Sequence, residues 1–380
     1  METIFWLSAA SLCFAFAGYA LLIECWRKCL KREETASFSV LRHRVTVVLV
    51  VANEGKRLEA RIENLLAGQR MADLLEIVVV SDGSTDDTAT FARKMAQADS
   101  RIKLVEILER QGKANGLNQG VAAAQGDVIV FADARQSFAP DTIPLLVKAL
   151  ADPRVGAVSG RLVIGGGDSA AGQGMGSYWS METRLRASEA KVDSCIGCTG
   201  AVYAIRRELY RPIPADTLLD DVVVPMMIAL QGYRVLYEPA ALAYDPQNLD
   251  PAKEQVRKRR TLAGNFQMLF RYPSWLLPWR NRLWFQLVAH KYLRLAGPLL
   301  LLLVLTSSAA LQESPFYAVC FWAQIVLYLL AMFGLAMPGL KWKVFSLPAG
   351  FLFLNWMTVR GLLHYLSGPG TGAWEMVKRN

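Results

Sequence analysis

The sequence predicts an α/β protein in which a domain with a mostly parallel sheet is joined to N-terminal and C-terminal transmembrane α-helices. Hydrophobic residues make up 53% of the 380-residue chain, and they gather toward its two ends. Between the ends, short runs of β-branched residues alternate with segments of helical periodicity. That alternation is typical of strands buried on both faces of a parallel sheet.

The first apolar segment, residues 4–23, lies in a predicted N-terminal region of residues 1–30 and carries no charge. It is long enough to cross a hydrocarbon core of about 30 Å as a helix. A cleaved signal peptide would have a positive start, whereas here Glu2 precedes the segment. Four basic residues follow it, namely Arg27, Lys28, Lys31 and Arg32. The positive-inside rule then places the N-terminus outside and the central domain in the cytoplasm.

The C-terminal region, residues 293–366, contains three more candidate membrane segments, at 293–311, 316–337 and 344–366. The third carries Asn355, Arg360 and His364, so it either crosses, lies partly in the interface or faces protein. Residues 271–292 mix Trp with Arg and Pro, as an interfacial segment does. If all three segments crossed the membrane fully, the basic residues of the tail, 367–380, would lie outside. Re-entry of 344–366 therefore stays open.

The net charge of +9 suits a protein at an anionic leaflet or a site that holds a pyrophosphate. The basic residues are not gathered on one element that could recognise DNA or RNA, which disfavours nucleic acid as a partner.

Cys195 and Cys198 form a C-x-x-C pair, but none of the three histidines is placed to complete a zinc site,. We interpret the pair as small residues in a tight loop.

Polar residues follow the predicted strands 45–52, 76–82, 101–107 and 127–133. In open α/β sheets, ligands bind at the carboxyl ends of the strands. Each residue alone has a structural explanation, such as a turn after an Asp-Gly pair. Together they predict a ligand site, and its members are Asn53, Glu54, Asp82, Lys113 and Asp133.

The motifs ANEG, VVVSDGSTDDT, GKANGLNQG and FADAR follow one another in this order. They resemble the family 2 glycosyltransferases, especially the membrane-bound branch of cellulose, chitin, hyaluronan and poly-N-acetylglucosamine synthases and ceramide glucosyltransferase. The resemblance runs from about Val45 to Gln267. It implies a Rossmann-like GT-A domain over residues 45–270.

The resemblance also implies roles in binding a nucleotide-sugar donor. Asn53 and Glu54 would lie against the base, Asp82 would contact the uracil or ribose, and Lys113 would neutralise phosphate charge. Asp133 matches the first acid of the family's D-x-D motif, which holds Mg²⁺ or Mn²⁺ on the diphosphate. Arg135 stands where the second acid is expected. Metal binding by this motif is therefore weakened, or Arg135 supplies positive charge itself.

The segment from residue 197 to 209 resembles the family's acceptor-lining loop and strand. Gly197, Thr199 and Gly200 would form the acceptor pocket, where small residues let a sugar approach the backbone. Residues 178–190 are expected to pack beside it, either as an amphipathic helix with exposed charges or in contact with substrate.

The acidic pair Asp220 and Asp221 stands where the family's general base opens a helix, with Asp221 as the base and Asp220 as its companion. The competing explanation for the acidic pair is that carboxylates are favourable at a helix N-terminus.

Arg257 and Arg260 resemble the (Q/R)-x-x-R-W motif and would hold the departing diphosphate, although Thr261 replaces the Trp. Binding of lipid headgroups by this basic run is the alternative.

The resemblance implies an inverting hexosyltransferase that moves a hexose or N-acetylhexosamine from a UDP-sugar to a growing β-linked polysaccharide. Transfer of one sugar to a membrane lipid, ceramide-like or polyprenyl, is the alternative, and a non-catalytic membrane scaffold is the third. We expect a multi-pass protein of a bacterial-type inner (plasma) membrane, with its catalytic domain in the cytoplasm. We also expect the protein to contact membrane lipids and an export partner.

Overall fold

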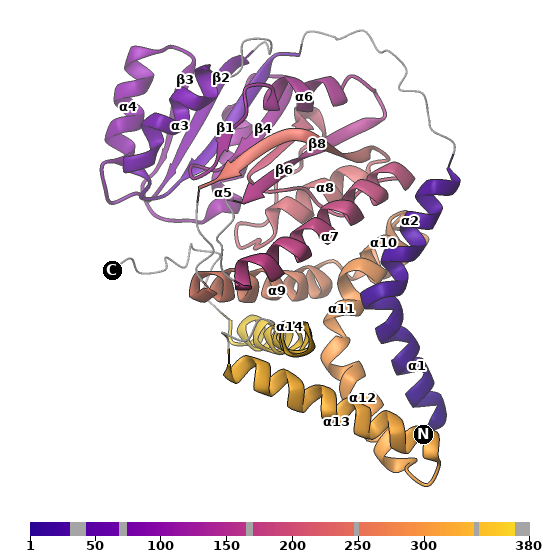
Figure 1. Ribbon diagram of the computed structural model, residues 1–380. Helices are drawn as coiled ribbons and strands as arrows, with labels where there is room; N and C mark the ends of the chain where they lie inside the picture. Colours follow the sequence, from indigo (N-terminus) through magenta and orange to yellow (C-terminus); the bar gives the residue numbers. More distant parts are fainter. Residues whose placement is uncertain (31–42, 68–73, 165–169, 247–250, 338–341, 369–380) are drawn as a thin grey trace. The chain divides into compact units, whose positions relative to one another are not determined.

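The computed structural model describes residues 1–30, 43–67, 74–164, 170–246, 251–337 and 342–368. Its chain divides into two compact units (Figure 1). The sheet unit comprises Trp26–Gly167, Gly176–Leu249 and Pro369–Asn380. The helical unit comprises Met1–Cys25, Asp168–Met175 and Asp250–Gly368.

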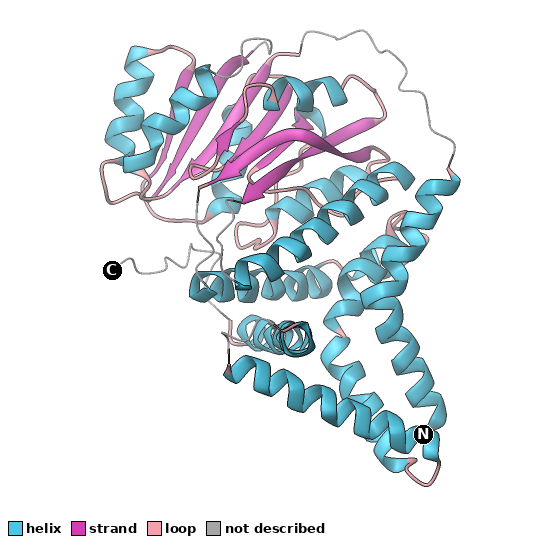
Figure 2. Ribbon diagram, viewed as in Figure 1, coloured by secondary structure: helices cyan, strands magenta, loops and turns pink. Residues whose placement is uncertain are grey.

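The sheet unit is built on one mixed sheet, which Figure 2 shows as a continuous layer of strands. Among the described residues it has eight strands in the order β3-β2-β1-β4-β7-β6-β8-β5. The first four pair in parallel, and β7 runs antiparallel to both β4 and β6. The mostly parallel α/β fold is therefore confirmed. The strands are β1 (Val45–Val51), β2 (Leu74–Asp82), β3 (Ile102–Ile107), β4 (Val128–Ala132), β5 (Ser137–Phe138), β6 (Val155–Ile164), β7 (Val202–Arg206) and β8 (Arg234–Asp245).

Helices cover both faces of the sheet because side chains alternate along each strand. Val47 and Leu49 of β1 join one buried core with Leu58 of α3. Val48 and Val50 point to the other face and meet α5. The helices of this unit are α3 (Gly55–Ala67), α4 (Thr88–Ala98), α5 (Lys113–Ala123), α6 (Thr142–Ala149), the greater part of α7 (Ala170–Val192) and α8 (Asp220–Leu230), with a 3-10 turn η2 (Arg207–Leu209).

Glycine lets α5 approach the sheet closely enough to set the position of its N-terminus. A Cβ built on Gly116 would lie 2.5 Å from the Cγ1 of Val50. We therefore expect Gly116→Ala to lower the free energy of unfolding by about 1–3 kcal/mol through overpacking. Thermal unfolding of the purified protein measures this. Gly350→Ala is the matched control, because Gly350 lies in a helix and has nothing within 4 Å of its Cβ position. Equal stability losses in the two variants would contradict the packing argument.

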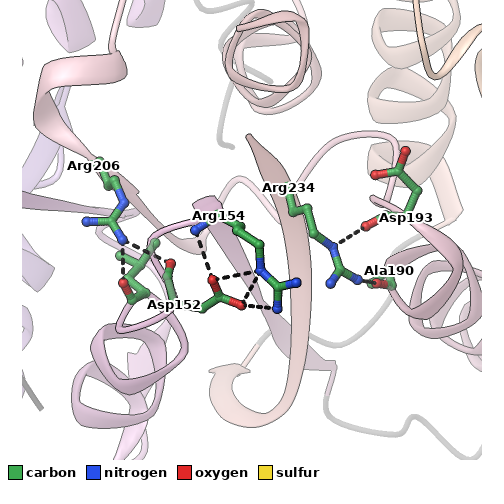
Figure 3. Close-up of polar contacts among 7 residues, drawn as sticks. Asp152, Arg154, Ala190, Asp193, Arg206 and Arg234 are labelled. Carbon is green, nitrogen blue, oxygen red and sulfur yellow. Dashed lines mark hydrogen bonds and ion pairs between the residues drawn. The ribbon is translucent and has the colours of Figure 1, made fainter. Parts of the chain in front are cut away.

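Arginines hold the ends of several elements to the sheet (Figure 3). Arg206 of β7 donates from Nη2 to the backbone oxygens of Leu150 and Asp152, at 2.7 and 3.0 Å. Arg234 of β8 donates to the carbonyl oxygens of Ala190 and Asp193, at 2.9 and 3.0 Å. Carbonyls at the end of a helix have no partner within the helix. Arg234 therefore caps α7 and fixes its C-terminal half against the sheet.

The helical unit holds the apolar ends of the chain. One helix runs from Glu2 to Cys29, as α1 (Glu2–Cys13), η1 (Phe14–Gly18) and α2 (Tyr19–Cys29). Among the described residues, this helix and the helix Pro315–Ala336 are long and apolar enough to cross a membrane. A third span results if the segments Trp284–Leu295 and Gly297–Ala310, which are bent by 62° against each other, count as one. The C-terminal elements are α9 (Pro251–Arg271), η3 (Pro273–Leu276), α10 (Trp284–Leu287), η4 (Val288–Tyr292), α11 (Leu293–Leu295), α12 (Gly297–Ala310), α13 (Pro315–Ala336) and α14 (Lys343–Leu366).

The last helix, α14, packs lengthwise on α9 and is not among the apolar spans. A Cβ on Gly361 would lie 2.6 Å from the Cβ of Leu262, and the rings of Phe270 and Tyr365 stack at 5.6 Å. Of the three polar residues singled out in 344–366, Asn355 is buried, His364 is partly buried and Arg360 is exposed, so only part of the polar surface of this segment faces protein. Helix α9 thus belongs to the helical unit, whereas the sequence boundaries placed it at the end of the 45–270 domain. Those boundaries stay a prediction.

Candidate active site

Lys113 brings together residues from three separate elements of the sheet unit. It is the first residue of α5, and its Nζ lies 3.0 Å from Oδ1 of Asp133, directly after β4. The same Nζ lies 3.5 Å from Oδ2 of Asp220, the first residue of α8. The structure therefore unites three residues that the sequence predicted to share a site.

The charge of Lys113 is held firmly by this arrangement. Burial works against the charged form, but the carboxylates of Asp133, Asp220 and Asp221 outweigh it and raise the pKa of the ammonium,. Lys113 therefore stays protonated over the physiological range. It is a fixed cation among three carboxylates.

The carboxylate of Asp82 is fully buried at the end of β2 and holds the loop that leads to Lys113. Its two oxygens accept hydrogen bonds from the backbone N–H groups of Gln111 and Gly112, each at 2.8 Å. These contacts are with the protein's own backbone. The expected contact of Asp82 with uracil or ribose stays a prediction.

We expect Asp82→Asn to weaken nucleotide binding indirectly, because the amide NH₂ would face a backbone donor. Losing one of these charge-assisted bonds costs about 1.5–3 kcal/mol. The loop that carries Lys113 would shift as a result. Titration with UDP measures the change in affinity. Asp99→Asn, at a partly exposed carboxylate directly after α4, should leave that affinity unchanged.

Asn53 and Glu54 lie just after β1 and are tied to the segment that follows β2. Asn53 has a positive φ of 56°, and its Oδ1 accepts from the backbone N–H of Thr85 at 2.8 Å. The backbone N–H of Glu54 donates to Oγ1 of Thr88 at 2.9 Å, and its carboxylate pairs with Arg57. The two strand-end motifs thus form one surface, while contact with a base stays a prediction.

Arg135, which replaces the second acid of the D-x-D pattern, forms an ion pair within the sheet unit. Its Nη2 lies 2.6 Å from Oδ2 of Asp245, a buried carboxylate at the end of β8. Gln136 donates to the same oxygen at 3.0 Å. Asp245 was missed by the sequence reasoning. Its position at a strand end was the available signal, but the pairing joins residues 110 positions apart.

The acidic pair lies at the N-terminus of α8, where the two side chains differ in exposure. Asp220 is 5% exposed, whereas Asp221 is partly exposed. A Cβ on Gly200 would lie 3.1 Å from Oδ2 of Asp221, and the N–H of Cys198 donates to the Asp221 carbonyl at 2.7 Å. The predicted acceptor loop therefore packs against Asp221, and the missing side chain of Gly200 leaves room for its carboxylate.

The other two loop residues predicted to line the acceptor pocket also lie in this contact. Gly197 has a φ of +81°, and its Cβ position faces Val222 at 3.0 Å. Thr199 is buried and donates from Oγ1 to the Gly160 carbonyl at 2.9 Å. The structure thus places Gly197, Thr199 and Gly200 in one turn beside the proposed base.

Comparison with known proteins agrees with this geometry. Residues 46–213 match the family model of glycosyl transferase family 2. The chain carries a family 2 glycosyltransferase domain with a GT-A-like fold. The resemblance inferred from the motifs is confirmed.

Two curated relatives of this domain come from bacteria. The poly-β-1,6-N-acetyl-D-glucosamine synthase of Staphylococcus aureus (strain COL) is 28% identical over 205 residues, which are 53% of this chain and 49% of the relative. An N-acetylglucosaminyltransferase of Rhizobium leguminosarum bv. viciae is 28% identical over 220 residues, 52% of this chain and 50% of the relative. The chain thus spans about half the length of these relatives.

A solved structure matches nearly the whole chain. The mannosyltransferase PcManGT from Pyrobaculum calidifontis, in complex with GDP-Man and Mn²⁺, gives a TM-score of 0.72 at 26% identity. The match covers 97% of this chain and 99% of that one. The similarity therefore extends beyond the family 2 domain to the helices on either side of it.

The two loop cysteines of the family 2 domain are buried and unbridged. Burial raises the pKa of the Cys198 thiol well above its usual value,. In the part of the chain that the structure describes, no three His, Cys, Asp or Glu side chains gather as a metal site. The burial of the two cysteines agrees with small residues packed in a tight loop.

Arg257 and Arg260 lie on α9 in the helical unit, whereas the other candidates belong to the sheet unit. Thr261, which replaces the motif's Trp, donates from Oγ1 to the Arg257 carbonyl at 3.0 Å. The Thr261 hydroxyl is therefore hydrogen-bonded within α9. Contact between the two arginines and a diphosphate stays a prediction.

Proposed function

We propose that the chain is an inverting hexosyltransferase that adds a hexose or N-acetylhexosamine from a UDP-sugar to a growing β-linked polysaccharide, with its family 2 domain on the cytoplasmic side of the membrane. The observation that carries the proposal is the placement of Asp221. It is partly exposed at the start of α8, beside the gap at Gly200 and next to the cluster formed by Lys113, Asp133 and Asp220. The bacterial relatives that handle N-acetylglucosamine support the choice of sugar.

In the proposed reaction an acceptor hydroxyl attacks the anomeric carbon while Asp221 takes up its proton. The bond from that carbon to the diphosphate oxygen breaks, and the nucleoside diphosphate leaves with the bonding electrons. Lys113 stabilises the negative charge on the diphosphate. Arg257 and Arg260, whose pattern resembles the (Q/R)-x-x-R-W motif, would contribute further positive charge to the departing diphosphate.

Asp133 is the residue that would hold Mg²⁺ or Mn²⁺ in this chain. The fit is limited but real, because the carboxylates of Asp133 and Asp220 already converge on one cation, the Lys113 ammonium. With Arg135 paired to Asp245, Asp133 is the carboxylate of this motif that would hold a metal,. When bound, a divalent cation neutralises charge on the leaving diphosphate.

Transfer of a single sugar to a membrane lipid is the second candidate. The solved structure that matches nearly the full length of the chain is named a mannosyltransferase, whereas the polysaccharide synthase is matched over about half of its own length. Acceptor type, rather than the chemistry at Asp221, separates the two candidates.

Incubation of the full chain in lipid nanodiscs with UDP-N-acetylglucosamine, UDP-glucose or GDP-mannose tests the proposal. We expect a UDP-sugar to be consumed and a long polymer to form, measured by size-exclusion analysis of the products. One sugar on an extractable lipid would support the second candidate. No transfer from any donor, with or without Mn²⁺, would contradict both.

A further inference from the structure

Arg61 of α3 is a buried arginine of the sheet unit whose charge has no role in the proposed reaction so far. It is 3% exposed. Its hydrogen bonds go to a backbone carbonyl and to a side-chain amide, so among the described residues no carboxylate is bonded to it directly. We infer that Arg61 is a positioning residue that holds Asp133 in place for the nucleotide-sugar donor, an inference that rests on the proposed function.

Arg61 contacts the backbone of Asp133 at the point where the sheet stops supporting the chain. Strand β4 ends at Ala132, and its pairing with β1 and β7 ends at the same residue. Asp133 is the next residue, and its carbonyl oxygen accepts a hydrogen bond from Nε of Arg61 at 3.0 Å. The bond from α3 therefore fixes the backbone from which the Asp133 carboxylate extends to Lys113.

The same turn of α3 also holds the far end of this segment. Nη1 of Arg61 donates to Oδ1 of Asn64 at 2.5 Å. Asn64 in turn bonds both backbone groups of Phe138 in β5, accepting from its N–H at 2.8 Å and donating to its carbonyl at 3.0 Å. The Arg61 guanidinium lies 4.2 Å from the centroid of the Phe138 ring, a cation–π contact,. One turn of helix thus holds the chain on both sides of the 133–138 segment.

The charge of Arg61 points to an electrostatic role as well. Burial lowers the pKa of its guanidinium to about 9, while the nearby carboxylate of Asp133 acts in the opposite direction,. The side chain is therefore still charged at neutral pH. For stability alone, a well-packed apolar side chain often serves as well as a buried charge or better. The charge of Arg61 acts on Asp133, where the donor's phosphates are proposed to bind.

Asp133 is therefore held by two cations that come from different helices. Lys113 of α5 contacts its carboxylate at 3.0 Å, and Arg61 of α3 holds its backbone and adds positive charge beside it. Since Arg61 is almost fully enclosed, it acts through Asp133 and not by touching the donor. Without Arg61, the Asp133 carbonyl loses its donor, and the carboxylate is no longer fixed where it can present a cation to the diphosphate.

A double-mutant cycle on UDP binding tests this role without requiring turnover. The full chain in nanodiscs is titrated with UDP in the presence of Mn²⁺ by isothermal titration calorimetry. Arg61→Met removes the charge at similar volume and should weaken UDP binding about tenfold, equivalent to about 1.4 kcal/mol. In a protein that already carries Asp133→Ala, the same change should have no further effect, because Arg61 acts through Asp133. Arg61→Lys keeps a charged donor and should retain most of the affinity.

Arg206→Met is the matched control for the loss of an arginine that bonds backbone carbonyls. Arg206 donates to the carbonyls of Leu150 and Asp152, and it pairs with Val128, at the opposite end of β4 from Asp133. Its replacement should lower the melting temperature and leave UDP affinity unchanged. If Arg61→Met does not fold, Arg61→Gln, which is neutral but keeps an N–H donor, takes its place in the cycle.

The outcomes separate the positioning role from the proposed function. Unchanged UDP affinity on loss of Arg61, or a loss that recurs in full beside Asp133→Ala, would overturn the inference. So would an equal loss of affinity in Arg206→Met, or an Arg61→Lys variant that binds no better than Arg61→Met. Coupling between Arg61 and Asp133 in a protein that transfers no sugar would keep the positioning role and contradict the proposed function.

Discussion

Replacing Asp221 by Asn is expected to lower the rate of sugar transfer by about 10²–10⁴-fold, the usual contribution of a general base. The amide has nearly the same shape as the carboxylate, so the contact at Gly200 is kept while the proton acceptor is lost. Donor binding should remain, because Asp133 and Lys113, the residues proposed to bind the donor, are unchanged. Turnover of the saturated enzyme, followed by release of nucleoside diphosphate, measures the effect.

Asp220→Asn is the matched comparison for that experiment. Asp220 is nearly fully buried and ion-paired with Lys113, so its loss should change donor affinity and stability as well as rate. Two variants that behaved alike, with turnover close to normal, would remove Asp221 from its role as base. A loss confined to donor affinity in Asp221→Asn would lead to the same conclusion.

Replacing Lys113 by Met is expected to reduce donor affinity by roughly 10- to 100-fold, the range for a lost hydrogen bond to a charged group. Methionine fills similar space without charge, so three carboxylates would face the donor's phosphates with no fixed cation between them. Lys113→Arg keeps the charge and should retain much of the affinity. Titration with UDP measures each variant, and unchanged affinity in Lys113→Met would contradict the assignment.

The pH dependence of stability gives an independent check on Lys113. Its pKa is raised in the folded state, so its contribution to stability is complete below the unfolded pKa of about 10.4. It is lost only as the pH rises through the folded pKa,. The difference in stability between wild type and Lys113→Met should therefore stay constant from about pH 6 to about pH 9. A steep change in that window would show that Lys113 is not held among the carboxylates.

Much of the fold and part of the site could be predicted because the relevant signals are local in the sequence. Continuous apolar runs such as 45–52 predict strands buried on both faces, and parallel strands bring their carboxyl ends to one edge. That rule is enough to predict that Lys113 lies near Asp133. The first apolar segment likewise predicted a helix long enough to cross a membrane, which the structure confirms in length and composition.

Other features depend on which residues meet across long stretches of chain. The backbone bonds of Asp82 and the pairing of Arg135 with Asp245 join separate elements. The grouping of α9 with α14 depends on a close approach at Gly361. No periodicity encodes such contacts.

The parallel α/β core, the apolar ends and the acidic, basic and glycine residues at the strand ends could all be read from the amino-acid sequence. The pairing of Lys113 with Asp133 and Asp220, and of Arg135 with Asp245, became visible only in the folded chain. Strand and helix patterns arise from neighbouring residues, whereas the pairing of buried charges depends on the distances that the packed sheet and helices set.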